Sequence, residues 1–388
     1  MRGKYPLFFE QGEGNMNGIQ RDRLVNQFKA LVEIDSLSFK ERAMAEALKK
    51  AFAQVGVLPE EDDAAAHYHS EVGNLYGCLP GCPKMSPLLF SCHMDTVEPG
   101  IGKKAIVHAD GKIPSDGKTI LGADDLAGMC ELLEALRVLQ ENHLAHRPLE
   151  IVLPFAEEAY VKGSRFFDFS RLKAKEGYVL DLSAPIGFAS LQEPTLVTFT
   201  ITVSGKAAHA GFAPEEGIHA IAAAAAIVQH LPQGHVTSGT VLNIGVIHGG
   251  KATNIVPETV VMQGELRSYD HAEANRLLER VRKTSVECAA AYGAQVDIAS
   301  ETELTAYKID AREPVVKRFE EACRKEGIEP RLTRTFGGSD ANSFNRAGGK
   351  VIVLASAMYA CHTKREYTTV ADMEKATAIL LRLMRGGL

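Results

Sequence analysis

Histidine and acidic residues stand where short apolar runs of this sequence end. The residues in question are His93, Asp95, Asp124, Glu157, Glu158, Asp181 and His362. Six of them follow an apolar run, and Asp124 opens a helical run instead. Imidazole nitrogens and carboxylate oxygens are the ligands that zinc and related divalent cations take in proteins. Side chains beyond the carboxyl ends of neighbouring parallel strands face one crevice. The residue types and their positions therefore predict a hydrolytic site that holds two metal ions.

The elements that must position these side chains follow from hydrophobic periodicity. Four apolar runs predict buried strands, at residues 88–90, 151–153, 178–180 and 351–354. In that order they precede His93, the Glu157–Glu158 pair, Asp181 and His362. Asp124 opens a predicted helix instead, because apolar residues recur at helical spacing from Met129 to Leu139.

Each of these residues has an ordinary structural explanation when it is taken alone. An aspartate at the start of a helix, such as Asp124, usually caps that helix. The group as a whole favours chemistry. His93 and Asp95 are two residues apart and point to the same side, so Asp95 can orient His93 as a metal ligand. Asp124 is predicted to bridge the two cations, and Asp125 to cap the helix or support the site.

The Glu157–Glu158 pair is predicted to divide two roles between its members. Adjacent acids often mark a solvated loop, and they repel each other unless charge compensates them. A cation bound by one of them supplies that compensation. Glu158 is predicted to be the ligand. Glu157 is predicted to be the general base, which takes a proton from the attacking water and passes it to the leaving amine.

The length of the chain predicts two domains, since 388 residues exceed the size at which one hydrophobic core stops growing. Strand-like and helical runs alternate up to Asp181 and again from residue 311, which is typical of an α/β layered domain. His362 belongs with ligands that precede residue 182. The catalytic domain is therefore predicted to be discontinuous, at 18–183 and 301–388. Residues 1–17 are predicted to be a flexible tail, with either Met1 or Met16 as the start.

The middle of the chain predicts an inserted α+β domain over residues 184–300. Thr195 to Val203 alternates apolar and polar side chains, as a half-buried strand does. A helix at 217–231 follows, then strands near 240–247 and 258–267, a helix at 271–292 and a strand at 294–299. That order, β-α-β-β-α-β, is ferredoxin-like. His209 lies in a loop after the first strand, where its side chain can reach away from its own domain.

Helices are also predicted near both ends of the chain, at about residues 20–34 and 371–384. Between them, Ser38-Phe39-Lys40-Glu41 matches a capping box. This match predicts that another helix begins there and packs its alanines and leucines on the sheet.

Composition excludes several classes of function. The net charge of -6, from 43 basic and 49 acidic residues, argues against a nucleic-acid partner. No apolar stretch reaches the length of a membrane span. Seven scattered cysteines in a chain of this size indicate no disulfide framework and predict a cytoplasmic protein. A small substrate is the expected partner.

The motifs together resemble those of the peptidase T group of cocatalytic zinc metallopeptidases, which are relatives of the carboxypeptidases and aminoacylase deacylases. The resemblance covers about residues 20–388. Its motifs are Ser91-Cys92-His93-Met94-Asp95-Thr96, Leu121-Gly122-Ala123-Asp124-Asp125, Phe155-Ala156-Glu157-Glu158, Asp181, Ala252-Thr253-Asn254-Ile255-Val256-Pro257, Gly264-Glu265-Leu266-Arg267, Gly337-Gly338-Ser339-Asp340 and His362.

The resemblance implies a dizinc aminopeptidase of short peptides, with cobalt or manganese as alternatives to zinc, and a three-layer catalytic domain. It implies that one cation is held by His93, Asp124 and Asp181. The other cation would be held by Asp124, Glu158 and His362. Substrate would be bound by Asn254, Arg267, Gly338 and Ser339. The inserted domain would pair with its copy in a homodimer, so that His209 would stabilise the oxyanion in the partner's site.

Two departures from the family pattern bear on specificity. The chain has His209-Ala210-Gly211 where the family usually has His-Pro-Gly, and residues 356–361 lack the glycines of tripeptidases. A deacylase or carboxypeptidase of the same superfamily is therefore the alternative function. An inactive dimeric scaffold is a third reading, against which the intact set of acids argues.

Overall fold

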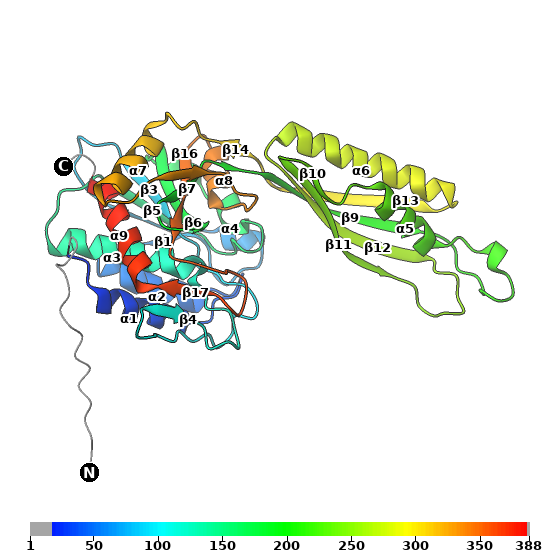
Figure 1. Ribbon diagram of the computed structural model, residues 1–388, viewed down its shortest axis with the longest axis horizontal. Coiled ribbons are helices and arrows are strands. Elements are labelled where there is room, and N and C mark those ends of the chain that lie inside the picture. Colours follow the sequence, from blue (N-terminus) through cyan, green and yellow to red (C-terminus); the bar gives the residue numbers. More distant parts are fainter. Residues whose placement is uncertain (1–17, 386–388) are drawn as a thin grey trace, which may run out of the picture.

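The computed structural model describes residues 18–385, which form two lobes joined by a narrow neck (Figure 1). The predicted tail at residues 1–17, and with it the choice between Met1 and Met16, lies outside the described residues. One lobe contains both ends of the described chain, and the other is built from its middle. Segments from both ends of the described chain thus build one lobe together.

An eight-stranded sheet forms the centre of the larger lobe. Its strand order is β1 (Glu60–Glu61), β2 (Leu75–Leu79), β5 (Leu149–Leu153), β3 (Leu88–Ser91), β6 (Glu176–Ser183), β16 (Lys350–Ser356), β7 (Phe188–Ser190) and β15 (Arg331–Thr333). The four predicted strands are β5, β3, β6 and β16, which are neighbours and parallel. Their carboxyl ends therefore meet at one edge, as the argument from the sequence requires.

Helices and loops cover both faces of this sheet. Successive side chains of a strand alternate between the faces, so that Phe90 and Leu180 pack on one side and Leu89 and Val179 on the other. The first side carries α1 (Arg21–Val32), α2 (Arg42–Ala53), α3 (Ala123–Glu141), α7 (Pro314–Lys325) and α9 (Val370–Arg385). The other carries α8 (Asp340–Arg346). The predicted three-layer α/β architecture is confirmed.

The α3 helix lies unusually close to the sheet, and this closeness positions its first turn. At Gly128 an added Cβ would lie 2.8 Å from the Leu180 Cβ and 2.8 Å from its carbonyl oxygen. Only glycine permits that approach. Because Asp124 and Asp125 open α3, they are brought to the edge of the sheet beside the end of β6.

The smaller lobe has the predicted ferredoxin-like order, with one added edge strand at Gly234–Thr237 that was not predicted. Its sheet runs β10 (Gly234–Thr237), β11 (Thr240–Gly249), β12 (Thr259–Ser268), β9 (Thr195–Ser204) and β13 (Gln295–Leu304), all antiparallel. Two helices, α5 (Ala220–His230) and α6 (His271–Ala291), share a core with one face of it. The alternation predicted for β9 is present, since Val197, Phe199 and Ile201 are buried in that core.

The structure moves the boundaries of the inserted domain. The prediction began the insert at residue 184, but β7, at Phe188–Ser190, still pairs with β15 and β16 in the large sheet. The two-stranded ribbon of β8 (Gln192–Glu193) and β14 (Tyr307–Lys308) forms the neck. The five-stranded sheet itself extends from Thr195 to Leu304. Short strands are hard to delimit from sequence because they lack enough residues to show a period.

The predicted capping box is wrong. Helix α2 begins at Arg42, and no side chain caps its first turn. The Ser38 hydroxyl instead donates to Asp95 at 2.7 Å, and Glu41 accepts the N–H groups of Phe39 and Ala156. The side chains of Ser38 and Glu41 thus form hydrogen bonds with the distant residues Asp95 and Ala156, and they do not pair as a capping box would.

Smaller elements complete the described chain. β4 (Lys112–Pro114) pairs with β17 (Tyr367–Thr369), and α4 (Lys162–Arg165) follows the loop that contains Glu157 and Glu158. No helix among residues 18–385 is long and apolar enough to cross a membrane.

Candidate metal centre

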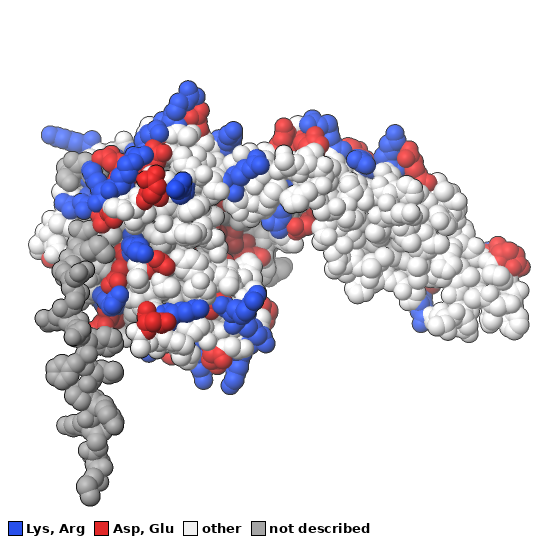
Figure 2. Space-filling view, in the orientation of Figure 1, with Lys and Arg blue, Asp and Glu red and all other residues white. Residues whose placement is uncertain are grey.

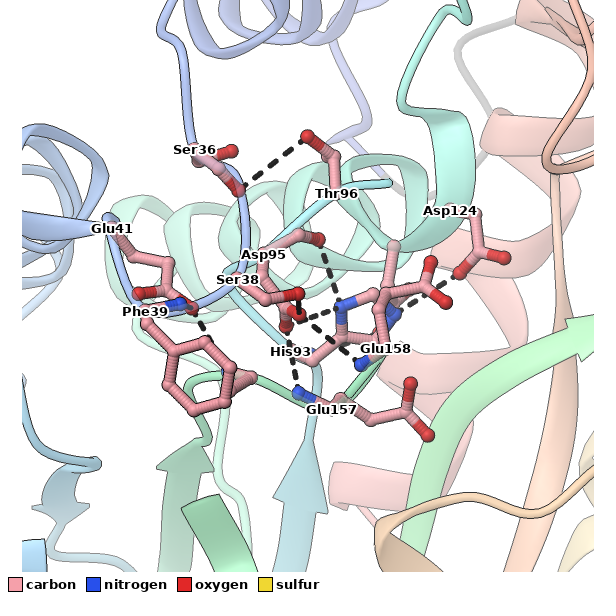
Figure 3. Close-up of polar contacts among 12 residues, drawn as sticks. Ser36, Ser38, Phe39, Glu41, His93, Asp95, Thr96, Asp124, Glu157 and Glu158 are labelled. Atoms are coloured by element: carbon pink, nitrogen blue, oxygen red, sulfur yellow. Dashed lines mark hydrogen bonds and ion pairs between the residues drawn. The ribbon is translucent and has the colours of Figure 1, made fainter. Parts of the chain in front are cut away.

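The carboxyl edge of the large sheet gathers the predicted ligands. His93 follows β3, Glu157 and Glu158 follow β5, and Asp124 lies in the first turn of α3. His362 lies in the connection between β16 and β17. Figure 3 shows His93, Asp124, Glu157 and Glu158 side by side at the strand ends. The residues that the sequence placed in one crevice do lie together.

Asp181 differs from the prediction in one detail, because it lies within β6 rather than after it. The pairing of β6 with β16 shifts register between Val353 and Ala355, which face Val179 and Leu182. Leu180 and Asp181 thus stand opposite a single residue of β16, as in a β-bulge. A bulge turns a side chain out of the alternating pattern, and such bulges are common beside active sites.

The distances within the cluster suit metal ligation. His93 Nε2 lies 3.0 Å from Asp124 Oδ1, and His362 Nε2 lies 2.9 Å from Glu158 Oε1 and 3.2 Å from Asp124 Oδ2. Two triads have ligand atoms within 4.8 Å of one another: His93 with Asp124 and Glu158, and His93 with Glu157 and Asp181. Asp124 contacts both histidines, as a bridging ligand must. The division of the ligands between two cations stays a prediction.

His93 is held in one tautomer by the residue behind it. Its Nδ1 lies 3.0 Å from the backbone carbonyl oxygen of Asp95 and 3.3 Å from the Asp95 carboxylate. A carbonyl oxygen can only accept, so Nδ1 carries the proton. Nε2, which faces Asp124, is then the nitrogen free to bind a cation.

Asp95 also fixes the loop that carries the glutamate pair (Figure 3). Its Oδ1 accepts the N–H of Glu157 at 2.9 Å, and its Oδ2 accepts the N–H of Glu158 at 3.1 Å. The preceding residue, Ala156, has a φ of 48°, a left-handed conformation that costs a non-glycine residue about 1 kcal/mol or more. Glu41 accepts the Ala156 N–H at 2.9 Å and helps to hold that conformation.

The electrostatics of the cluster call for added positive charge. Burial raises the pKa of Glu157 and of Asp181 well above the usual range, and neighbouring carboxylates raise both further. Burial lowers the pKa of His93, but Asp124 and Asp95 outweigh burial and raise it well above the usual range. Among residues 18–385, no lysine or arginine forms an ion pair with these carboxylates. The acid-rich donor set therefore fits divalent cations, which would neutralise it.

Asp125 supports the site and does not cap the helix. Its Oδ2 accepts the backbone N–H of His93 at 3.2 Å. Asp124 and Asp125 both have non-helical backbone angles, and the α3 N-terminus has no side-chain cap. The support predicted for Asp125 is thus present, whereas the alternative of capping is wrong.

Four residues in contact with the loops of the site were not predicted to belong to it: Ser38, Glu41, Lys103 and Glu366. All but Ser38 are buried. Lys103 Nζ donates to the carbonyl oxygens of Ile34 and Gly100 beneath the loop that precedes Asp124. Burial lowers the pKa of Lys103 to about 8. Glu366 had a signal in the sequence, since it stands four residues after His362, whereas Ser38 and Glu41 had only the misleading match to a capping box.

Three predicted substrate residues lie near the neck. Arg267 Nη1 donates to the carbonyl oxygen of Phe336 at 2.7 Å, beside the Gly337–Gly338 loop. Gly338 packs against Leu304, whose Cδ1 would lie 2.0 Å from an added Cβ. The Ser339 hydroxyl caps α8 and donates to the Glu193 carboxylate at 2.9 Å. Their binding roles stay predictions, and Ser339 already has structural partners.

His209 and Asn254 lie together but far from the ligands. The Asn254 carbonyl accepts the Ala210 N–H at 3.0 Å, so the two loops that carry them are joined. Figure 1 places these loops, between β9 and α5 and between β11 and β12, at the end of the small lobe remote from the large one. His209 is exposed, and its ring stacks on that of Phe212 with 4.3 Å between the ring centroids. Within one chain these residues do not reach the metal cluster.

Comparison with known proteins places the chain among peptidases. A family model described as peptidase family M28 matches residues 74–186, and one described as a peptidase dimerisation domain matches residues 192–291. The uncharacterized protein YqjE of Bacillus subtilis is 33% identical over 366 residues, which are 94% of this chain and 98% of that protein.

Two solved structures agree over nearly the whole chain. A tripeptidase from Staphylococcus aureus is 33% identical with a TM-score of 0.92, covering 96% of this chain and 99% of that one. The aminopeptidase PepT from Bacillus cereus is 35% identical with a TM-score of 0.88, covering 95% and 98%. The chain belongs to the peptidase T-like metallopeptidases. The resemblance inferred from the motifs is confirmed, and the dimerisation model covers most of the small lobe of this peptidase T-like chain.

Asp95 gives a direct test of how the peptidase T-like centre is held. In Asp95→Asn, an amide NH₂ replaces one of the two oxygens that accept from His93 and from the Glu157 and Glu158 backbone. We expect metal affinity to fall about 10- to 100-fold, as it does when the partner of a ligating histidine is removed. Equilibrium dialysis against zinc, followed by metal analysis, measures the change.

Ser38→Ala is the matched control, because it removes one donor to Asp95 and leaves the carboxylate in place. Its metal affinity should fall less than that of Asp95→Asn, because both carboxylate oxygens still accept the backbone N–H groups of Glu157 and Glu158. Unchanged affinity in Asp95→Asn would contradict the role given to Asp95.

Proposed function

We propose that this chain is an aminopeptidase that removes the N-terminal residue of short peptides, tripeptides foremost, with two zinc ions as its cofactor. The observation that carries the proposal is the convergence of the five predicted ligands and Glu157 at one edge of the sheet: His93, Asp124, Glu158, Asp181 and His362. Two relatives that are more than 30% identical over nearly their whole length are a tripeptidase and an aminopeptidase.

The chain's own residues divide the chemistry. Cations bound here would polarise the scissile carbonyl and lower the pKa of the attacking water. Glu157 lies beside His93 and Asp181, where its carboxylate could accept a proton from water and return it to the leaving amine. Asp95 fixes the Glu157 backbone, so the carboxyl starts from a defined position.

Zinc is proposed because two imidazoles and three carboxylates form a usual donor set for it, although cobalt and manganese take the same ligands. A Bacillus subtilis protein with this fold, 16% identical and with a TM-score of 0.71, is a dinuclear metal-binding peptidase. That likeness shows the fold alone, and the donor set supports the metal.

Substrate is proposed to lie between the metal cluster and the neck. Arg267 is held there by Glu265 and by the Phe336 carbonyl, and it keeps further N–H donors for a peptide carboxylate. The loop with Gly338 and Ser339 would form one wall. Asn254 and His209 would reach this space from a second subunit.

A homodimer through the small lobe is proposed to complete the site. β10 pairs with β11 only as far as Leu242, so in the described chain the outer edge of β11 beyond that point has no strand partner. Val246 and Ile247 on this strand are exposed, and Figure 2 shows few charged side chains on the small lobe below α6. An open edge with apolar side chains favours pairing with another chain.

We also propose a cytoplasmic location. All seven cysteines are free thiols, as is usual in a reducing compartment.

Replacement of Glu157 tests the general base. Glu157→Gln should abolish turnover and keep both cations, because the amide cannot take a proton. Turnover of a tripeptide and metal content are measured together. Glu158→Gln is the matched control, and it should lose a cation as well as activity. Glu157→Gln activity above about a thousandth of the parent value would show that another group is the base.

A panel of tripeptides with free and acetylated amino termini separates the aminopeptidase from the deacylase or carboxypeptidase alternative. An aminopeptidase should cleave the free peptide and reject the blocked one, because it recognises the charged amine. Product analysis by mass spectrometry shows which bond is broken. Preference for the blocked peptides would contradict the aminopeptidase assignment. Cleavage of neither, by the zinc-loaded protein, would favour an inactive scaffold.

Mixing two inactive variants tests whether His209 acts across the dimer. His209→Ala and Glu157→Gln should each be inactive alone. After the subunits are exchanged, the His209→Ala subunit of a mixed dimer has its own Glu157 and receives His209 from its partner. Random pairing in a twofold dimer should restore about a quarter of the parent activity. If no activity returns while mixed dimers are detected by mass, His209 does not act in the partner's site.

A further inference from the structure

A single buried carboxylate holds the loop that presents Asp124. Glu366 is 0% exposed. Its Oε2 accepts the N–H groups of Leu121 at 2.7 Å and Gly122 at 2.8 Å, and its Oε1 accepts the N–H of Asp124 at 3.1 Å. Both oxygens of the side chain are therefore directed at one stretch of backbone.

That stretch has few partners of its own. Gly122 has a φ of 76°, and Asp124 has non-helical angles of -82° and 105°. The first N–H groups of a helix have no acceptor within the helix, and no side chain of the first turn caps α3. Glu366 supplies the acceptors from more than 240 residues away in the sequence.

The same residue is fixed relative to His362. The Glu366 N–H donates to the Thr363 carbonyl oxygen at 3.0 Å, which closes a tight turn directly after His362. The Thr363 hydroxyl donates back to the Ala360 carbonyl oxygen at 2.7 Å. His362, with a φ of 61°, is thus held in a strained conformation by the turn that ends at Glu366.

We propose that Glu366 is a positioning residue of the metal centre, which sets the geometry between Asp124 and His362 by clamping the backbone of one to the turn of the other. The two ligands meet at 3.2 Å, between His362 Nε2 and Asp124 Oδ2. Loss of the clamp releases two of the three ligands predicted for one cation, and only one of the three predicted for the other. The two sites therefore respond unequally.

Backbone N–H groups favour the charged form of Glu366, although burial raises its pKa to about 7. Three backbone N–H groups approach it, and Lys103 lies on the other side of the Gly122 loop, where its Cδ and Cε would be 3.2 Å from a Cβ at position 122. Lys103 is itself held by the Gly100 carbonyl oxygen at 3.2 Å and the Ile34 carbonyl oxygen at 3.0 Å. A glutamine at position 366 would turn an NH₂ group toward at least one backbone N–H.

The test measures metal binding in the full-length protein without a substrate. Apo protein is titrated with Zn²⁺ by calorimetry, and with Co²⁺ by visible absorption, for the parent, Glu366→Gln and Glu366→Asp. Glu150→Gln is the matched control, because Glu150 is also a buried acid whose two oxygens accept backbone N–H groups, from Lys173 at 3.0 Å and Ala174 at 2.8 Å, in a connection that carries no predicted ligand. Thermal melting of each apo protein records stability separately.

The parent and Glu150→Gln should each bind two cations per subunit, and the affinities of Glu150→Gln should match those of the parent. Glu366→Gln should bind one of the two about 10- to 100-fold more weakly, with an altered Co²⁺ spectrum. Glu366→Asp should fall between them, because it keeps the charge with a shorter reach, and it serves as the test if Glu366→Gln does not fold. Parent-like binding of both cations by the Glu366 variants, or equal weakening of both, would overturn the inference.

This inference rests on the dinuclear site of the proposed function, but the two can fail separately. If the parent protein binds no pair of cations, the proposed function fails. If the parent binds two and the Glu366 variants bind them equally well, only the positioning role fails.

Discussion

Concentrated negative charge at one edge of the large sheet is the constraint on which the rest of the structure depends. Asp124, Glu157, Glu158 and Asp181 meet there with only two imidazoles, and in the described chain no lysine or arginine pairs with them. Burial makes such a group costly unless its members hold protons or cations neutralise them. Divalent cations would replace the repulsion among these carboxylates by attraction to the metal. Metal binding would therefore be coupled to the ordering of this edge of the sheet.

A second consequence concerns how the ligands are held. The loops of the site are fixed mostly through their backbone N–H groups, by carboxylates that belong to other elements. Asp95 and Glu41 hold residues 156–158, Asp125 holds His93, and Glu366 holds residues 121–124. Backbone clamping leaves the side chains free for cations. It also explains how left-handed residues such as Ala156 and His362 persist, since their neighbours are fixed on both sides.

The two-lobed shape divides the proposed chemistry between subunits. The proposed ligands and the proposed base belong to the large lobe, whereas the loops that carry His209 and Asn254 lie at the far end of the small one. Their two loops are joined by the Ala210 N–H and the Asn254 carbonyl, so they would enter a partner's site as a unit. The open edge of β11 gives a physical means of pairing, and its exposed valine and isoleucine would be buried by it.

The sequence by itself determined the strands that carry the ligands, the discontinuous large domain and the ferredoxin-like order of the small one. Hydrophobic periodicity reports which face of each element is buried, and a polar residue at the end of a buried strand is conspicuous. The sequence also marked Glu157 and the five predicted ligands, because their residue types are costly to bury without a function. Tertiary structure decided the rest: the bulge that turns Asp181, the true partners of Ser38 and Glu41, the neck, and the clamp from Glu366. These features depend on contacts between residues far apart in the chain, up to 245 positions for Glu366 and Leu121, and such contacts leave no periodic trace in the local sequence.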